Sequence, residues 1–369
     1  MAGDAQSFLK KIWASRVHVH HTEPDRLTGL LSFDDVDHLL TSTAIRTPAV
    51  RIAQDGSLLP TSRYTRSGAS LAGEALTGLV DARKVLALFD DGATVVLQGL
   101  HRYWPPLREL TAQLELDLGH PCQANAYLTP PGSQGFAVHS DSHDVFVFQT
   151  HGTKLWEIHG EDGPEEVLLE PGLSMYLPTG TPHSARAQDG ASLHVTLGIN
   201  QLTWRGLVRR SVEQVLDDVP DNHLPAGYLD RPEDLSAALA ARLRSVADAI
   251  AGLDAGDAVD REVERFLTSR GSLLAGGLAD VLAVGDLTDD TRLRRRPGKP
   301  MVLRPRGDRV VVLLGDRTLD VPARLLPALE KLREERELAP ADLATHLDEQ
   351  SRLVLCRRLV REGLLEVAR

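Results

Sequence analysis

The 369-residue sequence has only two cysteines, Cys122 and Cys356, which lie far apart and belong to no C-x-x-C pattern. We therefore expect neither a disulfide framework nor a thiolate zinc site. No stretch approaches the roughly 18 uninterrupted apolar residues of a membrane-spanning helix, so no membrane partner is expected. The opening MAGDAQSFLKKIW has no apolar run after a basic start and is not typical of a secretory signal. The cytoplasm is the expected location.

Lysine is rare, and acidic residues outnumber basic ones. The chain has 41 Lys and Arg against 52 Asp and Glu, which gives a formal net charge of −11. This balance argues against nucleic-acid binding over the whole surface, although it is compatible with a local basic patch. Hydrophobic residues make up 42% of the chain, as in globular proteins, and the length predicts two or three domains.

Short strand-like segments dominate residues 122–199, whereas the preceding part of the chain has mixed helix and strand signals. Turns such as PPGSQG, THGT, EPG and PTGTP separate the strands. Many short strands at regular spacing predict a sandwich or a small barrel. The predicted strands are CQANAYLT, GFAVHSD, DVFVFQ, KLWEIHG, EEVLLE, LSMYLP and SLHVTLGI.

The remainder of the chain changes character twice. Residues 207–287 have a helical pattern, with one apolar stripe that is typical of a core face or a dimer surface. The basic run RLRRRPGKPMVLRPRGDR, interrupted by Pro and Gly, predicts a linker. Strands and three helices after it have the outline of a winged helix. The stripe consists of Leu235, Leu239, Leu243, Val246, Ile250 and Leu253.

A possible metal site lies in the segment HSDSHD. Residues i and i+2 of a strand share a face, so His139 and Asp141 can reach one ion together. His183, after a Pro/Gly turn, could complete two imidazoles and one carboxylate, the ligand set of non-heme Fe(II) oxygenases. His143 lies on the same face and Asp144 on the other, so spacing alone does not select the ligand. A solvated strand end is the alternative interpretation.

Three of the predicted strands carry polar residues on one face. Such faces usually turn to water, which is the alternative to a polar interior. Inside a barrel they could bind a dicarboxylate co-substrate, which needs a cation and hydroxyl donors, and Lys154 would supply the cation. The same-face sets are Asn125 and Tyr127, then Lys154, Trp156 and Ile158, and then Ser192, His194 and Thr196.

Residues 123–196 resemble the JmjC-type, cupin-like 2-oxoglutarate oxygenases, specifically the ribosomal oxygenase branch. The matching motifs are NAYLTPPGSQG, HSDSHDVFVFQ, GTKLW, P-x-G-x-P-H and LHVT. The resemblance implies an α+β fold with a double-stranded β-helix (jelly-roll or cupin) core. It also implies a catalytic domain with a helical N-terminal region over residues 1–204, a helical dimerisation region over 205–290, and a basic linker with a winged-helix domain over 291–369.

The resemblance also implies which residues form the site. His139, Asp141 and His183 would hold Fe(II), and His143 would have no ligand role. Lys154 would pair with the distal carboxylate of 2-oxoglutarate, which with O2 is a co-substrate. Three further polar residues would line the co-substrate pocket, namely Asn125, Tyr127 and Thr196.

The implied activity is hydroxylation of a side chain of a polypeptide, with a ribosomal protein as the first candidate, by a homodimer. A natural-product peptide or a small metabolite is an alternative substrate, and a non-catalytic cupin with a winged helix is an alternative class of protein. Arginines near the last helix have acidic neighbours, so we expect no sequence-specific nucleic-acid partner. The cluster of His18, His20 and His21 has a spacing that suggests a second metal site, which we do not expect.

Overall fold

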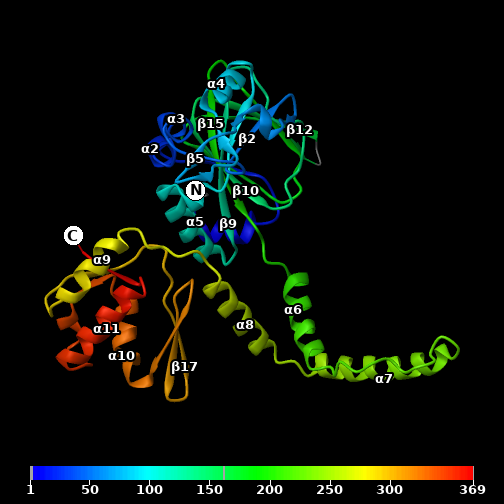
Figure 1. Ribbon diagram of the computed structural model, residues 1–369, viewed down its shortest axis with the longest axis vertical. Coiled ribbons are helices and arrows are strands. Elements are labelled where there is room, and N and C mark those ends of the chain that lie inside the picture. Colours follow the sequence, from blue (N-terminus) through cyan, green and yellow to red (C-terminus); the bar gives the residue numbers. More distant parts are fainter. Residues whose placement is uncertain (1–2, 161–162, 369) are drawn as a thin grey trace. The chain divides into compact units, whose positions relative to one another are not determined.

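The structure, a computed structural model, describes residues 3–160 and 163–368 and forms two compact units, Met1–Gln201 and Leu202–Arg369 (Figure 1). The predicted domain boundary at residue 204 lies next to this division, while the boundary at residue 290 stays a prediction. Within the described part of the chain, no helix combines the length and the apolar character needed to cross a bilayer.

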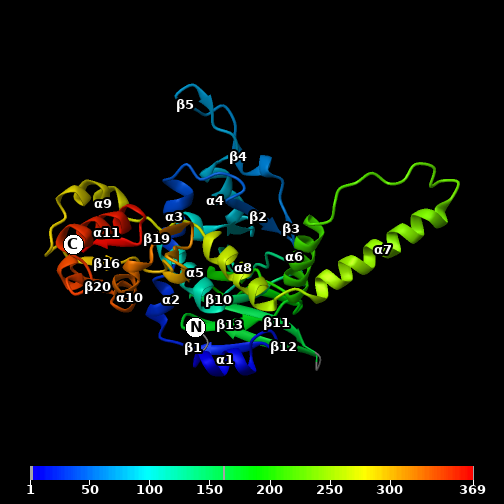
Figure 2. The same cartoon turned by 90° about the horizontal axis from the view of Figure 1, so that it is seen from below.

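Two antiparallel sheets form the centre of the first unit (Figures 1 and 2). The larger sheet has the strand order β1-β13-β10-β15-β9-β8-β2-β3, and the smaller has the order β12-β11-β14. From β10 to β15 the chain crosses between the sheets four times, since β10, β13 and β15 lie in the larger sheet and β11, β12 and β14 in the smaller, as in a double-stranded β-helix. The strands are β1 His18–His21, β2 Val50–Gln54, β3 Ser57–Leu58, β8 Thr94–Leu97, β9 Cys122–Thr129, β10 Asp144–His151, β11 Lys154–Gly160, β12 Gly163–Leu169, β13 Leu173–Leu177, β14 His183–Ala187 and β15 Ser192–Ile199.

The larger sheet is covered on both faces. On its outer face, Phe148 and Leu197 belong to a core that also includes residues of the surrounding helices. On its inner face, Val147 packs with Trp156 and Ile158 of the smaller sheet. Strand residues alternate between these two environments, because successive side chains point to opposite faces. The polar faces predicted for β9, β11 and β15 therefore point between the sheets, and the alternative of polar faces turned to water is wrong for these strands.

Helices and short hairpins complete the first unit. Ser32 caps α3 through a reciprocal capping box with Asp35, as the Ser and acidic residues of SFDDVDHLL predict. Helix α5 begins at Pro105, the favoured first helical residue. The helices are α1 Ala5–Lys11, α2 Pro24–Thr28, α3 Phe33–Thr41, α4 Ala82–Asp90 and α5 Pro105–Leu118, and the hairpin strands are β4 Thr65–Arg66, β5 Ser70–Leu71, β6 Glu74–Ala75 and β7 Leu79–Val80.

The second unit begins with helices and ends in a mixed core. Leu329, Leu355 and Leu359 of its last two helices pack with strand residues in one apolar cluster. The elements are α6 Trp204–Asp217, α7 Pro232–Ala251, α8 Ala255–Thr268, α9 Gly277–Ala283, β16 Leu293–Arg295, β17 Val302–Arg306, β18 Arg309–Leu313, β19 Thr318–Pro322, α10 Leu326–Glu334, β20 Glu337–Leu338, α11 Glu349–Arg361 and β21 Leu365–Val367.

The basic run over residues 292–309 is not the linker that its composition predicts. It contributes β16 and β17, and two of its cations are buried in ion pairs. Arg296 pairs with Asp280, and the Nζ of Lys299 lies 2.6 Å from Asp316. Partners distant in the sequence neutralise these charges, which is why the local composition misled the prediction.

Candidate metal and co-substrate site

Three potential metal ligands converge between the two sheets. His183 opens β14, and His139 and Asp141 lie in the segment that precedes β10. The ligand atoms of the three side chains all lie within 4.8 Å of one another, and in the described residues this is the one group of three or more His, Cys, Asp or Glu so arranged. The sequence-predicted set is therefore brought together, although its role as a metal site stays a prediction.

Backbone hydrogen bonds hold the two imidazoles in place. The amide of His139 donates to the carbonyl of His183 at 3.0 Å, and the amide of His183 donates back at 2.8 Å. This reciprocal pair ties the pre-β10 segment directly to β14. The amide of Gly180 likewise donates to the Asp141 carbonyl at 2.9 Å. Main-chain atoms thus position all three side chains.

The protonation state of the imidazoles suits metal binding. The Nδ1 atoms of His139 and His183 lie 2.9 Å from the carbonyl oxygens of Ala137 and Thr181, respectively. A carbonyl only accepts, so each Nδ1 donates a proton to it, and Nε2 is the nitrogen through which each neutral ring would coordinate a cation. Burial lowers the pKa of His183, which favours the neutral form that coordinates a cation.

The neighbouring candidates have other partners. The Nε2 of His143 lies 3.5 Å from the side-chain nitrogen of Gln123, and His143 is not in the ligand group. Asp144 is buried and accepts hydrogen bonds from the Tyr176 hydroxyl at 2.6 Å and from Thr179. These contacts show Asp144 as a structural carboxylate that fixes the start of β10.

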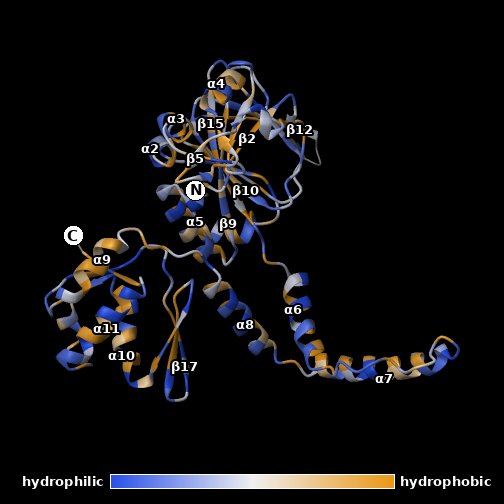
Figure 3. Cartoon of the chain, viewed as in Figure 1, coloured by the Kyte–Doolittle hydropathy of each residue, from blue (hydrophilic) through white to orange (hydrophobic). Residues whose placement is uncertain are grey.

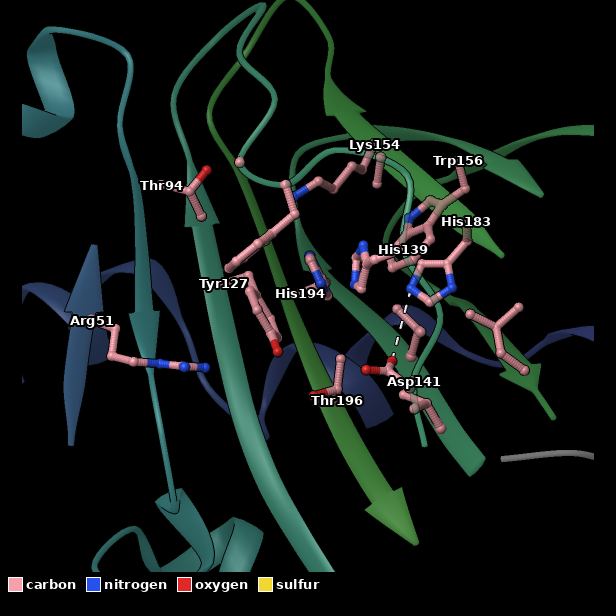
Figure 4. A pocket seen from close by; sticks show the side chains of 16 residues that line it. Arg51, Thr94, Tyr127, His139, Asp141, Lys154, Trp156, His183, His194 and Thr196 are labelled. Atoms are coloured by element: carbon pink, nitrogen blue, oxygen red, sulfur yellow. Dashed lines mark ion pairs between the residues drawn. The ribbon is translucent and has the colours of Figure 1, made fainter. Parts of the chain in front are cut away.

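Lys154 is a buried cation in the same pocket (Figure 4). Its side chain is only 3% exposed, and its Nζ donates to the hydroxyl of Thr129 at 2.8 Å. No carboxylate among the described residues pairs with it. Burial lowers the pKa of Lys154 to about 7. An ammonium in this setting is stabilised when an anion enters the pocket.

Aromatic side chains form the wall between the ligand group and the larger sheet. Tyr127 stacks on His194 with ring centroids 4.9 Å apart, and Trp156 contacts the same imidazole edge-on at 5.3 Å. Burial holds the pKa of His194 well below its usual value, so the ring is neutral. The Nδ1 of His194 and the Nε1 of Trp156 are buried without a hydrogen-bond partner. A ligand with polar atoms could satisfy both.

The remaining predicted pocket residues divide into two groups. Tyr127 and Thr196 line the pocket, and their contact with a co-substrate stays a prediction. Asn125 shares their strand face but is not among the lining residues, because its Oδ1 accepts a hydrogen bond from the amide of Gly99 at 3.0 Å. Sequence reasoning assigned no role to Arg51 or Thr94, which also line the pocket, since neither belongs to the matching motifs.

The His18, His20 and His21 cluster lies on the edge strand β1. The rings of His18 and His20 are stacked at 6.3 Å, but the three residues form no group of closely placed ligand atoms. The structure therefore gives no support to a second metal site among these described residues.

Comparison with known proteins agrees with this geometry. Residues 103–207 match the family model of the JmjC domain. The chain is 30% identical over 224 residues to rat ribosomal oxygenase 1, covering 53% of this chain and 35% of that protein. It is 38% identical over 150 residues to the bifunctional lysine-specific demethylase and histidyl-hydroxylase NO66 of Branchiostoma floridae, covering 38% of this chain and 24% of that protein.

The fold also matches a solved structure over its length. Escherichia coli ribosomal oxygenase YcfD has a TM-score of 0.55 at 20% identity, over 99% of this chain and 98% of that one.

The family-model match over residues 103–207 and the structural match agree with a JmjC/cupin fold of mixed α+β content. The chain is similar to proteins named ribosomal oxygenase, so the resemblance predicted from the motifs is confirmed. The chain matches only about a third of the length of rat ribosomal oxygenase 1.

Proposed function

We propose that this protein is an Fe(II)- and 2-oxoglutarate-dependent oxygenase that hydroxylates a side chain of a polypeptide. The observation that carries the proposal is the pairing, in one pocket, of a two-histidine, one-carboxylate group with a buried lysine that lacks an anionic partner. Three protein ligands leave open coordination positions, as this chemistry requires. When bound, iron and 2-oxoglutarate supply the activation of O2 for insertion of oxygen into a C–H bond.

The residues present fit these groups. His139 and His183 each offer a free Nε2, and Asp141 offers a carboxylate oxygen, while Lys154 would bind the distal carboxylate of the co-substrate. The hydroxyl of Thr129 orients the Lys154 ammonium. Trp156 and Ile158 exclude water from the neighbourhood of that ion pair.

A ribosomal protein is the first substrate to test, because relatives of the chain are named ribosomal oxygenase and histidyl-hydroxylase. Ribosomal proteins from a deletion strain and from its parent should be compared by mass spectrometry. The expected result is the loss of a single-oxygen mass increment from one protein in the deletion strain. In parallel, purified enzyme should form succinate from 2-oxoglutarate. Absence of succinate with every substrate would contradict the proposal and favour a non-catalytic module.

Lys154 predicts the pH dependence of co-substrate binding. Its cationic form binds the dicarboxylate, and its lowered pKa of about 7 means that this form is lost from the free enzyme as the pH rises above neutrality. The KM for 2-oxoglutarate should therefore rise between pH 7 and 9, by up to about tenfold per pH unit. Lys154→Arg is the matched control, because a guanidinium stays charged over this range. A flat KM profile for the wild-type enzyme would contradict the assignment.

We further propose that residues 207–287 mediate homodimerisation. Helix α7 buries none of its residues within the chain, and hydrophobic residues recur along its length (Figure 3). Leu239 and Leu243 of its apolar stripe are 52% and 58% exposed. Such a stripe needs a partner surface. Light scattering at micromolar concentration should give the mass of a dimer, and Leu239→Glu combined with Leu243→Glu should give a monomer. A monomer mass for the wild-type protein would contradict the proposed dimer.

We propose that residues 291–369 form a winged-helix domain that docks protein rather than reading DNA. Several of its arginines already form ion pairs: Arg294 pairs with Glu366, Arg352 with Asp289, and Arg358 with Glu362. Paired cations have little capacity left for phosphates. Full-length protein should bind duplex DNA weakly and without sequence preference, and a salt-resistant, sequence-selective gel shift would contradict this.

Action on a ribosomal protein would place the enzyme in the cytoplasm.

A further inference from the structure

Arg51 is a second cation in the pocket, and the proposed chemistry does not use it. It lies on β2 between Val50 and Ile52, whose side chains are fully buried in the outer core. Strand alternation therefore turns Arg51 to the inner face, where it lines the same pocket as Lys154.

The register of the larger sheet places Arg51 in line with the aromatic wall. Arg51 pairs with Val96 of β8, Val96 pairs with Tyr127 of β9, and Tyr127 pairs with His194 of β15. Directly paired residues share a face, and adjacent strands are about 4.8 Å apart, so a long side chain can reach over the short Val96 to Tyr127. Figure 4 shows Arg51 extending in this way.

The guanidinium of Arg51 has unmet hydrogen-bonding capacity. Its Nε is buried and has no hydrogen-bond partner, and none of the carboxylates in the described segments forms an ion pair with it. Arg210 and Arg352, by contrast, form ion pairs with Glu262 and Asp289, while the buried Nε of Arg357 is also without a partner among the described residues. A buried donor without an acceptor is costly, so this arrangement suits a group that arrives from outside.

Tyr127 connects Arg51 with the metal-ligand group. Burial and the Asp141 carboxylate raise the pKa of the Tyr127 phenol, while Arg51 lowers it. The phenol is therefore within electrostatic reach of both a predicted metal ligand and the guanidinium. Lys154 reaches the pocket from β11 of the smaller sheet, whereas Arg51 reaches it from β2 of the larger sheet, so the two cations lie on different sides of the pocket.

We infer that Arg51 is a substrate-binding residue whose guanidinium binds an oxygen acceptor of the polypeptide, next to the residue that is oxidised. The acceptor is a side-chain carboxylate or a main-chain carbonyl, since both match the planar fork of donors. The inference rests on the proposed function and deepens it, because it assigns the wall opposite the co-substrate cation to recognition of the polypeptide.

The test measures peptide binding in the absence of iron, by fluorescence anisotropy. The probes are fluorescein-labelled nonapeptide pools with a central histidine, the residue type for which the NO66 relatives are named, and with either Asp or Lys beside it. The variants are Arg51→Gln, Arg51→Lys and Arg51→Glu. Arg63→Gln is the control, because Arg63 is exposed and lies outside the pocket. Circular dichroism checks that each variant folds.

Arg51→Gln should weaken peptide binding about tenfold to a hundredfold, with Arg51→Lys intermediate and Arg63→Gln unchanged. If the acceptor is a carboxylate, the loss is confined to the Asp pool and Arg51→Glu reverses the preference. If the acceptor is a main-chain carbonyl, the affinity for both peptide pools falls by the same factor.

Peptide affinity within about twofold of the wild type in Arg51→Gln would overturn the inference, as would an equal loss of 2-oxoglutarate affinity or a wild type that binds neither pool at millimolar concentration. Failure of the wild type to form succinate, with peptide binding still dependent on Arg51, would count against the proposed function alone.

Discussion

Alanine at His139, Asp141 or His183 should abolish 2-oxoglutarate turnover and weaken iron binding. Each change removes one of the three proposed ligands, whose donor atoms lie within 4.8 Å of one another. The expected loss is at least about a hundredfold in turnover, because ligand geometry fixes the open coordination positions. Succinate formation and the iron content after dialysis are the measurements.

His143→Ala is the matched control for the ligand variants. His143 lies in the same HSDSHD segment, but its Nε2 is next to Gln123 rather than the ligand group. This variant should keep its iron. Loss of iron from His143→Ala together with retention by His139→Ala would show that the ligand assignment is wrong.

Lys154→Ala should raise the KM for 2-oxoglutarate about tenfold to a hundredfold. A hydrogen bond to a charged group contributes about 1.5–3 kcal/mol, and the buried ammonium forms no ion pair with the carboxylates of the described residues. Iron binding should survive, since the ligands lie on other segments. Lys154→Arg should retain part of the affinity, although a guanidinium needs more room beside Thr129.

Lys84→Ala provides the comparison for Lys154→Ala. Lys84 is exposed on α4, and its Nζ donates to the carbonyl of Thr65, so its loss should leave the KM for 2-oxoglutarate unchanged. The decisive measurement is 2-oxoglutarate affinity in the iron-loaded variants. Unchanged affinity in Lys154→Ala would place the co-substrate elsewhere in the molecule.

The alternation of side chains made much of the site predictable. Period-two patterns placed Tyr127, Lys154 and Thr196 on the polar faces of their strands without any knowledge of the sheet order, but they did not show whether those faces point inward. The turn before His183 made it a candidate third ligand, and the family resemblance favoured His139 over His143. What local patterns could not supply was the register between strands distant in sequence, such as the His139–His183 bridge.

Contacts between segments distant in the sequence also explain which site residues the sequence did not predict. Arg51 reaches the site only because β2 and β8 are added to the sheet beside β9, a long-range pairing that no local pattern shows. Asn125 shows the opposite case: its face was predicted correctly, but its amide binds the loop at Gly99. In the second unit, the charges of Arg296 and Lys299 suggested an exposed linker because their acidic partners lie elsewhere in the sequence.

The reciprocal amide–carbonyl hydrogen bonds between His139 and His183 have a consequence for how a metal ion would bind. The backbone, rather than an ion, fixes the distance between the two segments that carry the proposed ligands. Binding of a metal ion by these residues would therefore require little further ordering of the chain, unlike in small zinc domains whose folding depends on their ion.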